Sequence, residues 1–359
     1  MSMIGNAAPR PRPRLILPLG VSILLAALVP TVVGAADHAV QVAALSVYAN
    51  TADDAKLPDG RTIHIVCMGS GSPTVILTAG LGDWSVIWSR VQRAIAARTR
   101  TCAWDRPGFG LSSPSALAQS VDHTTDELQA ALRRSGINGP YVMVGHSLGG
   151  YETLLFSDRQ PRDVVGMVLV EPSLPDQARR FARAAPAMAK FIDDAQQGAL
   201  DFLKACADLA RTGEIGPDKL DLGNCRELQP YYPPSVTAAL VQAAADPRRH
   251  ETARSMHEHA DRSGELVVNP RRTYGRIPLV VLTAAGVPKL PPDTPKAVLD
   301  QLPAFTAEWS RGHAELAALS TRGVHRPVAD ADHYIQVGHS GAVIAAINEV
   351  LDAVDAPNR

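Results

Sequence analysis

Residues 145–150, which read Gly-His-Ser-Leu-Gly-Gly, are the segment whose residue types most directly indicate chemistry. They contain Gly-x-Ser-x-Gly, directly after an apolar run at 141–144 and directly before a helical pattern at 148–158. A serine in that context lies on a sharp strand-to-helix turn, with its hydroxyl exposed at the positive end of the helix. Gly145 and Gly149 are small enough for the neighbouring backbone to pass so tight a turn. The pattern therefore predicts that Ser147 is a nucleophile.

A serine hydroxyl needs a base that accepts its proton. Behind a turn of this kind, the catalytic histidine follows the last strand of the sheet. Residues 330–335, Asp-Ala-Asp-His-Tyr-Ile, form a polar loop between an apolar run at 324–328 and a helix, and they predict His333 as the base. His339 is the rival, but it falls at the start of the predicted closing helix. His146, beside the serine, is expected to shape the pocket.

Alternation of short apolar runs with helical spacing sets the expected fold class. Continuous apolar strands separated by helices indicate an α/β protein with a mainly parallel, doubly wound sheet covered on both faces. Strands are predicted near Leu45 to Tyr48 and at 61–67, 74–78, 101–104, 141–144, 164–170, 277–282 and 324–328, with helices at 86–97, 122–134, 148–158 and 342–354. Between Pro172 and Arg276 the strand runs give way to Ala-rich helical segments, which predict a helical lid.

The predicted organisation is a signal peptide at 1–36, a tether with the first strand at 37–57, a first core part at 58–171, the lid at 172–276 and a second core part at 277–359. Three arginines precede an uncharged apolar run at 15–33, and small residues follow at 34–36. This order is typical of a cleaved secretory signal and predicts a periplasmic or secreted protein without a membrane anchor. An uncleaved anchor stays open, because the run approaches the ~20 residues that span a bilayer.

Composition excludes some classes of protein. Net charge is −1 and aromatic residues make up 5% of the chain, so neither a basic stripe nor a base-stacking surface for nucleic acid is expected. The four cysteines, an even number in an exported chain, predict disulfides, for which three pairings exist. Cys-x-x-Cys does not occur, so no zinc or redox motif is predicted.

Four motifs in one order resemble the α/β-hydrolase superfamily, in its esterase, lipase and peroxidase-like branch. They are 78–84 (TAGLGDW), 104–112 (WDRPGFGLS), 145–150 and Asp332-His333. The resemblance implies the α/β-hydrolase fold with a lid. It also implies that the backbone N–H groups of Leu81 and Leu148 form the oxyanion hole, and that Asp105 and Arg106 are structural. Ala79 occupies the position where the family usually has histidine. This replacement changes only the side chain, so the backbone N–H donor is expected to remain.

The third member of the catalytic triad departs from the family's usual pattern. The strand after the lid ends without an acid, so the resemblance leaves Glu171, at the end of the strand before the lid, and Asp293, in a later loop. Glu171 is preferred because a rigid strand end fixes geometry better than a loop.

The fold implied by the resemblance also chooses among the disulfide pairings. Its second and fourth strands are neighbours, which favours Cys67–Cys102. Cys206 and Cys225 both lie in the lid, so their pairing would brace it.

The expected activity is hydrolysis of a small-molecule carboxylic ester through an acyl-enzyme intermediate, without metal or organic cofactor. Dehalogenases and epoxide hydrolases of this fold carry a carboxylate at the strand-to-helix turn where this chain has Ser147. The serine therefore argues against both of these activities. A C–C bond hydrolase or a lactonase would use the same triad. A catalytically inactive ligand-binding protein on this scaffold is the alternative from another class. Substrate identity and oligomeric state are not predicted.

Overall fold

A computed structural model of the chain describes residues 44–216, 219 and 224–355. The predicted signal peptide at 1–36 and most of the tether lie outside the described residues. The described strands are β1 Ala55–Lys56, β2 Thr62–Ile63, β3 Ile65–Met68, β4 Thr74–Thr78, β5 Thr101–Trp104, β6 Tyr141–His146, β7 Val164–Val170, β8 Leu279–Ala284 and β9 Gly323–Val328. The described helices are η2 Val47–Ala49, η3 Ser85–Trp88, α2 Ser89–Ile95, α3 Val121–Arg134, α4 Gly149–Arg159, α5 Gln177–Ala184, α6 Pro186–Arg211, α7 Pro234–Ala244, α8 Pro247–Glu258, α9 Ala260–Leu266, α10 Lys296–Ala317, α11 Ile335–Gly338 and α12 Ser340–Asp355.

The described residues form a seven-stranded sheet in the order β3-β5-β4-β6-β7-β8-β9. Only β3 runs antiparallel to its neighbour, β5, and the other neighbouring pairs are parallel. β1 and β2 form a separate antiparallel pair. All five residues of β4 are buried, as expected for a central parallel strand covered on both faces. The predicted fold class is confirmed.

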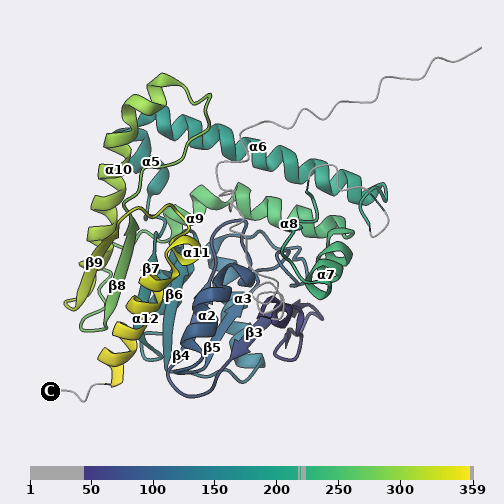
Figure 1. Cartoon of the computed structure of the whole chain (residues 1–359), viewed down its shortest axis with the longest axis horizontal. Helices are drawn as coiled ribbons and strands as arrows, with labels where there is room; N and C mark the ends of the chain where they lie inside the picture. The colour runs from purple at the N-terminus through teal and green to yellow at the C-terminus, as the bar shows by residue number, and fades with distance from the viewer. Residues whose placement is uncertain (1–43, 217–218, 220–223, 356–359) are drawn as a thin grey trace, which may run out of the picture.

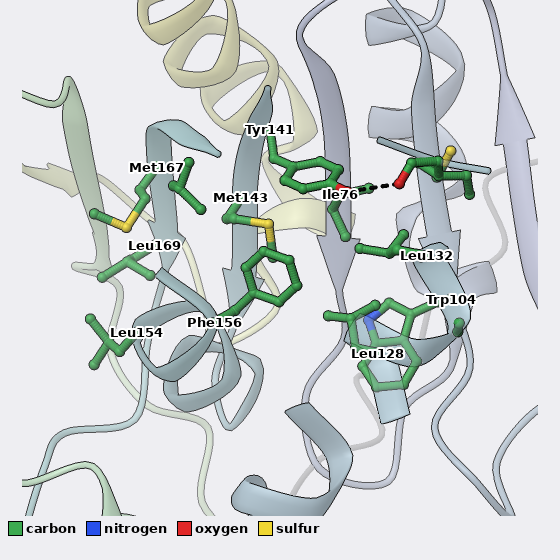
Figure 2. Packing of buried hydrophobic residues seen from close by; sticks show 14 of the residues in the cluster. Ile76, Trp104, Leu128, Leu132, Tyr141, Met143, Leu154, Phe156, Met167 and Leu169 are labelled. Atoms are coloured by element: carbon green, nitrogen blue, oxygen red, sulfur yellow. Dashed lines mark hydrogen bonds between the residues drawn. The ribbon is translucent and has the colours of Figure 1, made fainter. Parts of the chain in front are cut away.

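Helices cover both faces of the sheet, so the core has two layers (Figure 1). One layer joins the strands to α3, α4 and α10 through Leu128, Phe156 and Leu316. Figure 2 shows part of this layer, where the rings of Tyr141 and Phe156 meet edge to face with centroids 5.6 Å apart. The other layer joins the strands to α2 and α12.

Several elements differ from the sequence-based prediction. The strand predicted at 61–67 is divided into β2 and β3, which belong to different sheets. Residues 45–48, predicted as a strand, are helical and run into η2. Leu45 and Tyr48 are both buried, and a spacing of three places them on one side of a helical turn. Helix α10 was not predicted, because Pro303 lies inside it and several prolines precede it. Packing of its buried face against the core outweighs this local preference.

Helices α5 to α9 follow β7 and occupy 177–266, within the predicted lid. α6 and α8 cross above the end of the sheet nearest α9 and α11 in Figure 1. Leu203 of α6, Leu240 of α7 and Met256 of α8 form one apolar cluster with Leu148 of the serine turn. These helices therefore pack directly on the segment that carries Ser147.

Both cysteine pairs are joined in the structure. Cys67 and Cys102 lie opposite each other on β3 and β5, with Cα atoms 4.1 Å apart. Cys206 on α6 pairs with Cys225 at a Cα separation of 5.5 Å. The second bond ties α6 to the segment that leads to α7. Within the described ranges, no helix has the length and apolarity needed to cross a bilayer.

Replacing Cys206 and Cys225 by alanine is predicted to lower the free energy of unfolding by about 3 kcal/mol, because the bond closes a loop of roughly twenty residues. Urea unfolding of the oxidised protein measures this difference. Mass spectrometry of the wild-type protein should find no free thiol, and detection of four alkylated cysteines without prior reduction would contradict both pairings.

Candidate active site

Ser147 lies on the sharp turn between β6 and α4, with a positive φ of 50°. A Cβ at Gly145 would lie 2.4 Å from the Gly149 carbonyl oxygen, and one at Gly149 would lie 2.5 Å from that of Thr78. Side chains at either position would therefore force the turn apart, which explains the two glycines. The strained backbone of Ser147 keeps its side chain only partly covered, as the Gly-x-Ser-x-Gly pattern predicts.

The structure brings Ser147 and His333 together from positions 186 residues apart. His333 follows β9 in the loop before α11, and its Nε2 lies 3.0 Å from Ser147 Oγ. Burial lowers the pKa of His333 from 6.5 to about 4, while Asp332 opposes this shift. The ring is therefore neutral near pH 7 and able to accept the serine proton. The rival His339 lies between α11 and α12, where its backbone N–H donates to Ile335.

His146 holds the loop that carries His333. Its Nε2 lies 2.9 Å from the backbone carbonyl oxygen of His333, which can only accept, so Nε2 carries the proton. Burial lowers the pKa of His146 well below its ordinary value. Its Nδ1 lies 3.9 Å from Asp83 Oδ2, and neither atom has a hydrogen-bond partner among the described residues. Burial raises the pKa of Asp83 to about 7.

Glu171 lies at the end of β7, next to the serine turn, with a positive φ of 47°. Its carboxylate accepts a hydrogen bond at 2.6 Å from the backbone N–H of Ala284 and another at 2.6 Å from Trp309 Nε1. Burial raises the pKa of Glu171 to about 8. Asp293, by contrast, is exposed in the loop before α10. No carboxylate of the described residues is hydrogen-bonded to His333 Nδ1.

A hydrogen-bonded chain behind Glu171 was missed by the sequence analysis, which gave His313 and His325 no role. His313 Nε2 lies 2.7 Å from the Pro172 carbonyl oxygen and must donate to it. Its bare Nδ1 then accepts from the Thr283 hydroxyl at 2.6 Å, and that hydroxyl accepts from His325 Nε2 at 2.8 Å. The chain fixes the backbone directly after Glu171. His313 is a buried residue of α10. Because α10 was not predicted, no signal in the sequence indicated that His313 would lie beside Glu171.

The amide groups of Leu81 and Leu148 lie on the loop after β4 and on the serine turn. Neither N–H donates a hydrogen bond to another described residue. Gly80 lies in close contact with His146 and Asp83, since a Cβ there would be 2.9 Å from His146 Nδ1. Across the described ranges, no three His, Cys, Asp or Glu side chains converge as metal ligands would.

Asp105 and Arg106 are both buried. Asp105 accepts hydrogen bonds from the backbone N–H groups of Ser85 and Leu111, at 2.7 and 2.9 Å. It thereby ties the turn after β5 to the start of η3. Arg106 forms a buried ion pair with Glu152 of α4 at 2.5 Å.

Comparison with known proteins matches part of the chain to a family. Residues 73–205 match the family described as alpha/beta hydrolase fold. An uncharacterised protein of Bacillus subtilis, YqjL, is 33% identical over 110 residues, which cover 31% of this chain and 44% of that protein. The lipase LipV of Mycobacterium tuberculosis is 29% identical over 151 residues, 41% of this chain and 57% of the lipase. The chain thus spans less than two thirds of either relative.

Solved structures share the fold at low sequence identity. A putative lipase from Acinetobacter baumannii has a TM-score of 0.56 at 15% identity, with 88% of this chain and 96% of that chain covered. An epoxide hydrolase from Bacillus megaterium has a TM-score of 0.53 at 19% identity, with 83% and 99% covered. Together with the matched segment, these structures show that the chain has the alpha/beta hydrolase fold.

Proposed function

We propose that this protein is a serine hydrolase that cleaves carboxylic esters through an acyl-enzyme intermediate. The observation that carries the proposal is the 3.0 Å separation of Ser147 Oγ from His333 Nε2, on a strained strand-to-helix turn. A partly exposed serine within hydrogen-bond distance of a neutral imidazole is the arrangement that activates a hydroxyl for nucleophilic attack.

In the proposed mechanism, His333 Nε2 takes the proton of Ser147 as Oγ attacks the ester carbonyl. The amides of Leu81 and Leu148 stabilise the resulting oxyanion. His333 then gives its proton to the leaving alcohol, and a water molecule, deprotonated by the same ring, releases the acid from Ser147. His146 supports these steps by holding the His333 backbone carbonyl at 2.9 Å.

Glu171 is the proposed acid of the triad. Its place at the end of β7, beside the serine turn, and its two fixed carboxylate oxygens favour it over the exposed Asp293. In this role an ionised Glu171 stabilises the imidazolium that forms on His333.

The names of the relatives support a hydrolase and leave its bond type open, since they include lipases and an epoxide hydrolase. Serine at position 147, instead of a carboxylate, favours acyl transfer over epoxide opening. A lactonase or a C–C bond hydrolase would use the same residues, and a panel of p-nitrophenyl esters beside lactones separates these reactions. The apolar lid cluster near Leu148 supports an ester with a hydrophobic acyl group.

Ser147 is predicted to react with a fluorophosphonate probe, because His333 activates its hydroxyl. Labelling is followed by mass spectrometry of the tryptic peptide that contains Ser147, with Ser147→Ala as the unlabelled control. Absence of labelling in the folded wild-type protein would favour the inactive ligand-binding alternative.

Glu171→Gln is predicted to lower kcat for a p-nitrophenyl ester by about 10⁴-fold, because the imidazolium loses its counter-charge. Asp293→Asn serves as the matched control and should leave kcat unchanged. The opposite result for the two variants would assign the acid to Asp293.

Activity is predicted to fall as pH drops through about 8. His333 is already neutral above about pH 4, whereas Glu171 must be ionised to act as the counter-charge and burial raises its pKa to about 8, so protonation of Glu171 is expected to limit kcat/KM. Initial rates between about pH 5 and 10, with circular dichroism to verify folding at each pH, test this expectation. A rate that stays constant from about pH 9 to below about pH 6 in fully folded protein would contradict it.

A further inference from the structure

The two proposed oxyanion donors belong to separate segments of the chain, and catalysis requires them to point at one atom. Leu81 N–H lies in the loop after β4, and Leu148 N–H lies at the start of the helix that follows Ser147. The segments touch at Gly149, where a Cβ would lie 2.6 Å from the Ala79 carbonyl oxygen. This contact limits how closely they approach but does not orient the Leu81 peptide group.

Arg106 binds the loop directly before Leu81. Its Nη1 donates to the Gly80 carbonyl oxygen at 2.9 Å, and its Nη2 donates to the Ala79 carbonyl oxygen at 2.5 Å. The carbonyl of Gly80 and the N–H of Leu81 belong to one planar, trans peptide unit, so they point in opposite directions. Fixing the oxygen on one side therefore aims the N–H on the other. Hydrogen bonding at that carbonyl also polarises the N–H.

Glu152 connects Arg106, and with it the loop before Leu81, to helix α4, which follows Ser147. It lies in the first turn of α4, and its carboxylate binds Arg106 through Nε at 2.8 Å and Nη2 at 2.5 Å. The side chains of Arg106 and Glu152 are 2% and 0% exposed, so water does not compete for these bonds. Thr124 donates to the same carboxylate at 2.6 Å. The bidentate ion pair of Arg106 and Glu152 thus joins the loop that carries the Leu81 N–H to helix α4, which starts next to the Leu148 N–H.

We propose that Arg106 is a positioning residue that aims the Leu81 N–H into the oxyanion hole, with Glu152 as its anchor on α4. This inference rests on the proposed function. Stability alone does not require an ion pair at this place, because apolar side chains of similar volume often replace a buried pair without loss of stability. An apolar pair, however, cannot donate to the carbonyls of Ala79 and Gly80.

The double variant Arg106→Met/Glu152→Leu separates positioning from stability. It removes both charges together, so neither is left buried alone, and we expect it to fold. Because misplacement by about 1 Å costs on the order of 10²-fold in rate, kcat for a p-nitrophenyl ester should fall about 100-fold while KM changes little. The rate of fluorophosphonate labelling at Ser147 should fall in parallel, since the phosphonyl oxygen occupies the same hole.

Arg272→Met/Asp158→Leu is the matched control. Asp158 lies near the other end of α4, and Arg272 binds it through Nε and Nη2 at 3.1 and 2.8 Å. This variant removes a partly buried ion pair from the same helix and should keep wild-type kcat, whatever its melting temperature.

If the Arg106→Met/Glu152→Leu protein does not fold, the single variant Arg106→Lys tests the positioning role of Arg106. Lysine keeps the charge opposite Glu152 but lacks the planar fork that reaches both carbonyls and both carboxylate oxygens. A reduced kcat with unchanged KM in folded Arg106→Lys supports positioning. Wild-type kcat in either folded variant overturns it. Failure of the wild-type protein itself to label at Ser147 would instead reject the proposed function.

Discussion

The short contact between the hydroxyl of Ser147 and the imidazole of His333 is the constraint on which the rest of the site depends. The two residues are separated by 186 positions along the chain and meet 3.0 Å apart. Such a meeting is available to a parallel sheet because its strands end at a common edge. The loops after β6 and β9 meet there although β7 and β8 separate the two strands. The sheet therefore acts as the frame, and the loops at this edge supply the chemistry.

Burial controls protonation throughout this edge of the sheet. The pKa of His333 falls to about 4 and that of His313 to about 3, whereas the pKa of Glu171 rises to about 8. Each shift has the same first cause, since a low-dielectric surrounding disfavours the charged form of any group. The histidines are consequently fixed as neutral donors and acceptors with defined tautomers. His146 and His313 use this property to hold the backbone beside the two proposed catalytic groups.

Arg106 and Glu152 are buried as an oppositely charged pair. These residues remain an ion pair because each satisfies the other and the surplus N–H groups of the guanidinium bind backbone carbonyls. Asp105 directly precedes Arg106 in the chain. Its carboxylate accepts hydrogen bonds from the backbone N–H groups of Ser85 and Leu111, which lie in neighbouring turns. The turn after β5 thus organises the loop after β4 and the helix after β6, although it lies outside the proposed catalytic residues.

The amino-acid sequence by itself determined most of the sheet-forming segments and the serine turn. β4, β5 and β7 have the predicted bounds, since continuous apolar runs have no soluble alternative to burial in a covered sheet. Gly145 and Gly149 predicted the turn because only glycine fits backbone contacts so close. Cys67 and Cys102 followed once strand neighbours were assigned from the family resemblance.

Only the tertiary structure decided how the remaining groups meet. α10 escaped notice because its prolines oppose helix formation locally, and the core contacts that stabilise it come from distant segments. The partners of Glu171 are a backbone amide of β8 and an indole of α10, and sequence carries no record of such cross-element bonds. Residues 45–48 turned helical for a similar reason, as Tyr48 reaches Gln92 on α2 through its hydroxyl. Local patterns specify elements, whereas distances between side chains of different elements arise only when the whole chain packs.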